Sequence, residues 1–306
     1  LDNWNELERV TRLAREMSVK PAVLLRVAPD VQTDTHRYLQ TGHASSKFGF
    51  PFGDDQAKGA LLRILSEGQL QLMGLHAHSG TMLRETRPYQ ETLARLFELM
   101  RDVYAETHWW PEEMSPGGGW AIDTPDTPFI PPVEMLAKAL QTSMEQEMSS
   151  PGIAPSTPRL IIEPGRSIIA RAGVTIYRIG GQKRTPGGIT YLFVDGGMGD
   201  NIRPALYGAT YTAFAVEHAF TSLEGPVSLA GRYCESGDIL IEHVNLPGMK
   251  EGDLIAVPMT GAYCLPMASN YNLVPRSAVV LVSEESVEVM EWRETYSDIL
   301  SRYPAL

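Results

Sequence analysis

Two patterns of apolar residues divide this chain of 306 residues. Before about residue 165, stretches with an apolar residue every three or four positions alternate with short, continuous apolar runs. The first pattern is typical of helices that bury one face, and the second of buried strands. Helices are predicted over Trp4–Met17, Gln56–Ser66, Arg87–Tyr104 and Pro132–Met148, and strands over Pro21–Val27, Leu70–His76, Trp109–Ser115 and Leu160–Ile162. This alternation predicts parallel βα units.

The helical period disappears after Arg166, and short β-type runs follow, separated by turns such as Gly180-Gly181 and Pro186–Gly188. These runs are Val174–Ile179, Ile189–Val194, Val227–Leu229, Ile239–Val244, Leu254–Val257 and Ala278–Leu281. Such a series predicts an antiparallel sandwich or barrel. The predicted fold class is therefore α/β plus all-β, with one domain over residues 1–166 and a second over residues 167–306.

Polar residues and glycines follow three of the predicted strands, in the segments Gly74–Thr81, Gly117–Gly119 and Glu163–Arg166. Parallel strands end at the same edge of a sheet, so these segments are expected to converge there. Glycines let backbone N–H groups approach a phosphate closely, because no Cβ intervenes. Thr81 and Arg166 are expected to add a hydroxyl and a charge to the same phosphate.

Composition narrows the classes of partner. The formal net charge of −11 argues against nucleic acid or an anionic membrane as the main partner. No apolar run is long enough to span a bilayer. Two cysteines cannot form a disulfide framework, which favours the cytoplasm. His76 and His78 point to one face, but no further ligand stands at metal-binding spacing, so no metal site is predicted.

The motifs carry a resemblance that covers almost the whole chain. The chain resembles the fold-type-III, pyridoxal-phosphate-dependent decarboxylases, which have an alanine racemase-like barrel, and among them the diaminopimelate decarboxylases. The matching segments are Ser46–Gly49, Gly74–His78, Gly117–Gly119, Glu163–Ser167, Val194–Met198, Ile202–Tyr207, Cys234–Asp238, Gly261–Tyr263 and Ser269–Asn272. The resemblance implies the C-terminal half of a (β/α)8 barrel followed by the β domain, and a carboxy-lyase that converts meso-diaminopimelate to lysine.

The resemblance also implies a role for each matched residue. His78 would stack on the pyridine ring, and Glu163 would pair with its nitrogen. Cys234 would donate a proton after CO2 leaves. The other implied contacts are Thr81, Gly117, Gly118, Gly119, Gly165, Arg166 and Tyr263 with the cofactor, and Arg166, Arg203, Tyr207, Glu235 and Tyr263 with the amino-acid substrate. Because Cys234 and Glu235 serve the partner subunit's site in this family, a homodimer is implied.

Several of these residues have ordinary interpretations when taken singly. Cys234 alone would be an inert buried thiol, Asp195 a turn cap and Arg203 a surface arginine. The ordered set of motifs favours the functional roles.

One feature of the family has no counterpart in the sequence. The family's cofactor-bearing lysine lies at the end of the first barrel strand, in a Lys-Ala-Asn-like context. The lysines of this chain all lie in other contexts: Lys20, Lys47, Lys58, Lys138, Lys183 and Lys250. We therefore expect the chain to be N-terminally truncated and inactive alone. Two alternatives stay open: a related decarboxylase of another diamino or carrier-bound amino acid, and a non-catalytic fragment or partner subunit.

Overall fold

A computed structural model describes residues 1–31, 46–149, 156–217 and 222–304. The chain forms two compact units. The first unit comprises Leu1–Asp123 and Phe129–Ser167, and the second comprises Thr124–Pro128 and Ile168–Leu306. In the described part of the chain, no helix is long and apolar enough to cross a membrane.

A parallel sheet organises the first unit, as the alternating pattern predicts. Its strand order is β2-β1-β3-β4-β5, and every neighbouring pair is parallel. The strands are β1 (Ala22–Ala28), β2 (Phe50–Pro51), β3 (Gln71–His76), β4 (Glu113–Gly118) and β5 (Arg159–Glu163). The sequence pattern misses β2, because two residues are too few to show a period. It also ends the strand before β4 does, since the two glycines of β4 suggest a loop.

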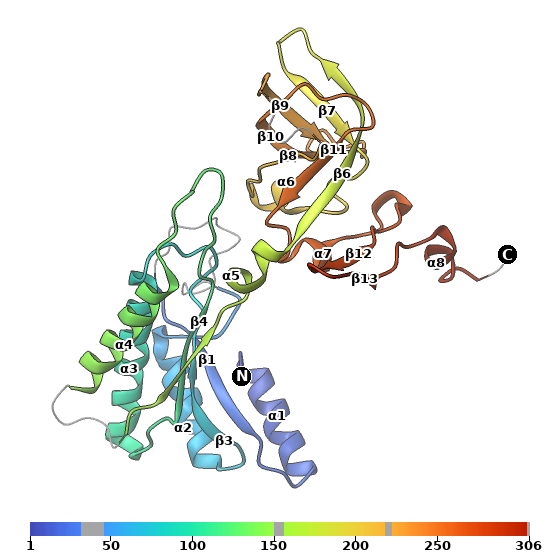
Figure 1. The fold of residues 1–306 in the computed structure, drawn as a ribbon. Coiled ribbons are helices and arrows are strands. Elements are labelled where there is room, and N and C mark those ends of the chain that lie inside the picture. The colour runs from blue at the N-terminus through green and yellow to red at the C-terminus, as the bar shows by residue number, and fades with distance from the viewer. Residues whose placement is uncertain (32–45, 150–155, 218–221, 305–306) are drawn as a thin grey trace. The chain divides into compact units, whose positions relative to one another are not determined.

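Amphipathic helices accompany this sheet, and α2, α3 and α4 lie side by side along it (Figure 1). They are α1 (Trp4–Glu16), α2 (Gln56–Glu67), α3 (Arg87–Thr107) and α4 (Val133–Met148), with a short 3-10 turn η2 (Gly53–Asp55) before α2. The side chain of Asn3 caps α1 by accepting a hydrogen bond from the Glu6 N–H at 3.0 Å. Most large apolar residues of α3 are buried in one core, and Leu93, Phe97 and Met100 are fully buried there.

The second unit contains a six-stranded sheet with the order β10-β9-β7-β6-β11-β8. Its strands are β6 (Val174–Arg184), β7 (Thr190–Val194), β8 (Phe214–Ala215), β9 (Gly225–Ala230), β10 (Ile239–Leu246) and β11 (Leu254–Pro258). The prediction of an antiparallel sheet is wrong for one pair, because β7 and β9 run parallel. The sheet is therefore mixed. The segment between β7 and β9 includes β8, so those two strands are not joined by a hairpin.

Two further details of the second unit differ from the prediction. Gly180 and Gly181 lie inside β6, where the pairing with β7 shifts register between Ile179 and Gly181, and so they do not form a turn.

Short helices also occur from Arg166 onward, and they are too brief to show a helical period. They are α5 (Arg166–Ile169), η3 (Ala170–Ala172), α6 (Arg203–Tyr207), α7 (Cys264–Met267), η4 (Tyr271–Leu273) and α8 (Tyr296–Leu300), and β12 (Val279–Val282) and β13 (Val287–Glu291) form a separate hairpin.

Alanine substitutions at two glycines of the first unit should change the free energy of unfolding in opposite directions. A Cβ at Gly74 in β3 would lie 1.7 Å from the backbone oxygen of Glu113 in β4. Gly74→Ala should therefore force the strands apart and lower the free energy of unfolding by about 1–3 kcal/mol or more. Among the described residues, a Cβ at Gly59 in α2 would have only the Trp4 ring within 4 Å, at a distance of 3.9 Å. Gly59→Ala should raise the free energy of unfolding by up to about 1 kcal/mol. Urea unfolding measures both, and equal effects would contradict this packing.

Candidate active site

In-register strands bring polar side chains to one edge of the parallel sheet. Arg26 of β1 pairs with His76 of β3, and His76 pairs with Ser115 of β4. Residues that are in register on neighbouring strands point to the same face of a sheet. Glu163 is the last residue of β5, and its register partner is Gly118 of β4. Glu163 is therefore not in register with Ser115, and its carboxylate reaches this row through side-chain contacts with His76 and Ser115.

Glu163 is held by two neighbouring side chains. The Nε2 atom of His76 lies 3.0 Å from Oε1 and 3.1 Å from Oε2 of the carboxylate. The Ser115 hydroxyl donates to Oε1 at 3.3 Å. The Glu163 side chain is nevertheless 46 % exposed, so its oxygens remain accessible to a ligand. An oriented, accessible carboxylate suits a cationic nitrogen in a flat ring.

Three glycines lie at the end of β4 and just after it, and they make different contacts. The Gly117 N–H donates to the Ser115 hydroxyl oxygen at 3.1 Å, and the Gly118 N–H donates to Nδ1 of His78 at 3.2 Å. A contact between this segment and a phosphate therefore falls to Gly119. Gly119 has a φ of 92°, and a Cβ there would lie 1.9 Å from the Gly80 oxygen. Only glycine allows this approach.

Two of the predicted phosphate contacts, Thr81 and Gly119, lie next to each other. Thr81 adjoins Gly119, since its Cα would lie 3.1 Å from a Cβ at that glycine. Arg166 begins α5 and is 8 % exposed, whereas Gly165 is exposed. The backbone of this edge is also anchored from α3, because the buried Tyr89 hydroxyl donates to the Gly118 oxygen at 2.9 Å.

His78 is a neutral imidazole in this setting. Burial lowers its pKa, and the charges of Arg26 and His76 lower it further, while Glu163 opposes them. Since Nδ1 accepts the N–H of Gly118, a neutral ring carries its proton on Nε2. Gly117 lets the backbone of β4 lie against this ring, because a Cβ there would stand 2.8 Å from Nδ1. A fixed, flat, uncharged ring is suited to stacking.

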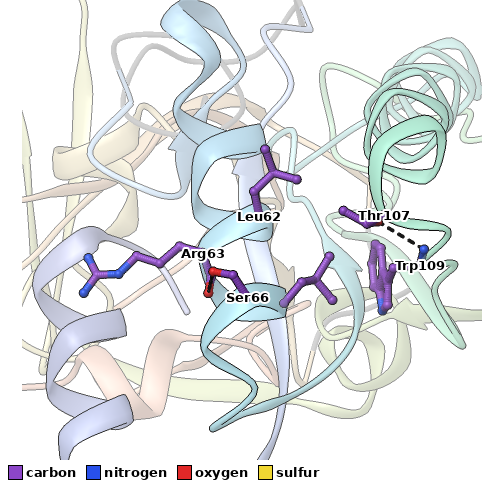
Figure 2. Close-up of a pocket in the computed structure, with 6 residues that line it drawn as sticks. Leu62, Arg63, Ser66, Thr107 and Trp109 are labelled. Atoms are coloured by element: carbon purple, nitrogen blue, oxygen red, sulfur yellow. Dashed lines mark hydrogen bonds between the residues drawn. The ribbon is translucent and has the colours of Figure 1, made fainter.

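A separate pocket of about 580 Å³ lies where β3 and β4 begin, at the opposite edge from these groups. Figure 2 shows its lining, in which the backbone N–H of Trp109 donates to the Thr107 hydroxyl at 3.1 Å. The lining residues are Leu62, Arg63, Leu65, Ser66, Thr107 and Trp109. None of the predicted site residues is among them.

In the second unit, Arg203 opens α6 and is only 4 % exposed. Its guanidinium lies 5.2 Å from the ring centroid of Tyr207 and 5.3 Å from that of Tyr263. Its Nε atom is buried with no hydrogen-bond partner among the described residues. A buried cation with an unused donor is a suitable anchor for a carboxylate.

Cys234 and Glu235 form a second group, on the segment between β9 and β10. The Cys234 thiol donates to Oε1 of Glu235 at 3.6 Å, and the Tyr271 hydroxyl donates to the same oxygen. The bond from Tyr271 is the largest cause of a lowered pKa for Glu235. The other oxygen, Oε2, is buried and has no partner within the described part of the chain. An ionised Glu235 can therefore accept a bond from an ammonium group.

Asp238 ties this segment to a neighbouring loop. Its carboxylate accepts the N–H of Met198 at 2.6 Å and that of Tyr233 at 2.8 Å. Burial raises the pKa of Asp238, and these two bonds oppose the rise. The bonds to Asp238 fix the backbone on which Cys234 and Glu235 are carried. Asp195 follows β7 and accepts the N–H of Arg178 in β6 at 2.8 Å, so it makes a bond between strands and not a turn cap.

Sequence reasoning gave no role to several residues of these groups. Arg26 was visible only as the end of a strand, and Ser115 only as the end of an apolar run. Tyr271 stood inside a matched motif without an assigned partner. A known register of the parallel strands would have aligned Arg26 with His76. No local pattern in the sequence encodes that register.

Comparisons with known proteins agree with this geometry. A family model described as "Pyridoxal-dependent decarboxylase, pyridoxal binding domain" matches residues 1–170. Diaminopimelate decarboxylase of Bacillus subtilis (strain 168) is 40 % identical over 304 residues, which cover 98 % of this chain and 68 % of that protein. This chain belongs to the pyridoxal-dependent decarboxylase family. The predicted family and its cofactor are thereby confirmed.

Other relatives in this family extend the comparison. The diaminopimelate decarboxylase of Synechocystis sp. (strain ATCC 27184 / PCC 6803 / Kazusa) is 38 % identical over 98 % of this chain and 63 % of its own. The crystal structure of diaminopimelate decarboxylase from M. jannaschii with L-lysine matches with a TM-score of 0.90 and 30 % identity, over 100 % of this chain and 69 % of that one. The chain thus spans about two thirds of the length of these relatives.

The residues at the sheet edge fit the cofactor of the family. Glu163 offers a carboxylate for the ring nitrogen, His78 a flat neutral ring for stacking, and Gly119 with Thr81 an N–H and a hydroxyl for the phosphate. No group of three or more metal-ligating side chains occurs among the described residues.

The neutral state of His78 predicts a loss of stability in acid. The unfolded chain takes up a proton at this histidine below about pH 6.5, whereas the folded chain does so only at lower pH. Stability therefore falls as the pH drops below about 6.5, by at most about 1.4 kcal/mol per pH unit. Urea unfolding at about pH 7.5 and pH 5.5 should show a smaller acid loss for His78→Gln than for the wild type.

The control for this measurement is His243→Gln, at an exposed histidine of β10. It should show the same acid loss as the wild type. An acid loss of His78→Gln as large as that of the wild type would contradict a neutral His78.

Proposed function

We propose that this protein decarboxylates meso-diaminopimelate to lysine with pyridoxal phosphate, as a cytoplasmic homodimer. Residues 1–166 would be the C-terminal half of a (β/α)8 barrel that binds the cofactor, and residues 167–306 the C-terminal β domain. The family and the identity of 40 % to a named diaminopimelate decarboxylase support the reaction. In a dimer, Cys234 and Glu235 of one copy would serve the site of the other copy.

One observation carries the choice of substrate. Within the described part of the chain, the second unit holds a buried arginine with an unused donor, Arg203, and a glutamate with an unused buried acceptor, Glu235. The distal end of diaminopimelate has both a carboxylate and an ammonium group, whereas ornithine and lysine have only an amine there. Buried polar groups that lack partners discriminate strongly against substrates that leave them unpaired. The pair therefore favours diaminopimelate, with Arg203 and Tyr207 on the carboxylate and Glu235 on the ammonium.

Each of these residues would then have its own role in the reaction. When bound, pyridoxal phosphate supplies an electron-accepting ring for the carbon that loses CO2. Glu163 would hold a positive charge at the ring nitrogen, and His78 would stack on the ring. Arg166 and Tyr263 would contact both cofactor and substrate, and Gly165 would hold the turn beside the cofactor. Cys234, whose thiol donates to Oε1 of Glu235, would deliver its proton to the substrate carbon after CO2 has left.

An assay of CO2 release tests the reaction and its specificity. The chain is assayed with pyridoxal phosphate alone, and again when co-expressed with the lysine-bearing first half of a family barrel. We expect no turnover alone, since no lysine stands in the family's context, and turnover of meso-diaminopimelate when that half is supplied. Turnover of ornithine or arginine in its place would favour the related-decarboxylase alternative. Absence of turnover in both arms would favour a non-catalytic subunit.

Cys234 provides a second test in the complemented enzyme. Cys234→Ala should lower turnover by about 10²–10⁴-fold, because it removes the proton donor. Binding of pyridoxal phosphate should be unchanged, since the cofactor contacts lie elsewhere. The matched control is Cys264→Ala, at the buried cysteine of α7, which should retain turnover. Near-normal turnover of Cys234→Ala would remove Cys234 from this role.

A further inference from the structure

Two polar side chains at the sheet edge have no role in the proposed function as stated so far. His76 is the last residue of β3, and Ser115 lies within β4. Both contact the carboxylate of Glu163 rather than an open face of the sheet. Neither is fully exposed: the His76 side chain is 16 % exposed, and Ser115 is buried completely.

Their geometry restrains the carboxylate from two sides. A glutamate at a strand end has several rotatable bonds, and its carboxylate is free to turn unless partners hold it. His76 Nε2 lies almost equally far from the two oxygens, at 3.0 Å and 3.1 Å, so it fixes the carboxylate as a whole. Ser115 then bonds Oε1 alone, at 3.3 Å, which removes rotation about the last bond.

The direction of the serine hydroxyl is itself set by the backbone. Because Ser115 Oγ accepts the N–H of Gly117 at 3.1 Å, its hydrogen is left for Glu163. The same hydroxyl therefore links the carboxylate to the first glycine of the segment that leads to Gly119. Through Ser115, a shift of the carboxylate would move the backbone at Gly117, and a shift of that backbone would move the carboxylate.

We propose that His76 and Ser115 are positioning residues that hold the Glu163 carboxylate against the ring nitrogen of the cofactor. The inference rests on the proposed function, since it needs a cofactor with a basic ring nitrogen. Arg26 pairs in register with His76, and its guanidinium adds a positive charge to the row of Arg26, His76 and Ser115. A carboxylate so held meets the ring without first losing rotational freedom, which strengthens binding.

The test measures binding of pyridoxamine 5′-phosphate to the chain by isothermal titration calorimetry. This probe has the ring nitrogen and phosphate of the cofactor but no aldehyde, so it cannot react with surface lysines. His76→Leu should weaken its binding about tenfold, and Ser115→Ala several-fold, as expected for loss of a charge-assisted hydrogen bond. His76→Gln keeps an N–H donor and should recover part of the affinity. The control His243→Leu, at an exposed site on β10, should bind like the wild type.

Two comparisons separate positioning from a merely structural role. In a Glu163→Gln background, His76→Leu should cause no further loss, because the carboxylate it orients is gone. Benzyl phosphate, which lacks the ring nitrogen, should bind all variants equally. Circular dichroism checks that each variant folds, and if His76→Leu does not, Ser115→Ala carries the same double-variant comparison.

The outcomes distinguish this inference from the proposed function. If the wild type binds the probe but His76→Leu and Ser115→Ala bind as tightly, the positioning role is overturned. The same holds if their losses persist in the Glu163→Gln background. If the wild type does not bind pyridoxamine 5′-phosphate, both the cofactor site and the inference are overturned.

Discussion

The register of the parallel strands is the constraint on which the cofactor edge depends. His76 meets Arg26 on one side and Ser115 on the other only because β1, β3 and β4 pair in that register. A slip of one residue would turn each side chain to the opposite face. Glycines permit the close pairing: a Cβ at Gly118 would lie 1.9 Å from the backbone oxygen of Glu163. The backbone that carries the site is thus inseparable from the packing of the sheet.

Long periodic elements could be predicted from the sequence, because their apolar residues repeat within one segment. Helix α3 is an example, since its buried residues follow the helical spacing along its length. Elements whose existence depends on distant partners could not. The two-residue strands β2 and β8 have no period, and the parallel pairing of β7 with β9 joins segments that no local pattern links. Glycines at 180 and 181 indicate a turn locally, yet pairing with β7 keeps them in a strand.

The site shows the same division. Residues that lie in recognisable motifs, such as Glu163 and Glu235, could be proposed for the site from the sequence. The residues that orient them could not, because a serine at the end of an apolar run or a tyrosine in a loop has no local signature. Ser115 and Tyr271 acquire meaning only when the fold sets them beside Glu163 and Glu235. Contacts between a carboxylate and its partners are set by tertiary structure, and the sequence shows only the residue types.

Glu163 is proposed to maintain a positive charge on the ring nitrogen of the cofactor. The most direct measurement is the ¹⁵N NMR chemical shift of ring-labelled pyridoxamine 5′-phosphate bound to the protein, followed as the pH is raised. We expect the bound ring nitrogen to stay protonated beyond the pH at which the free compound loses its proton, and Glu163→Gln to abolish this difference. A bound ring nitrogen that titrates as it does in free solution would contradict the account.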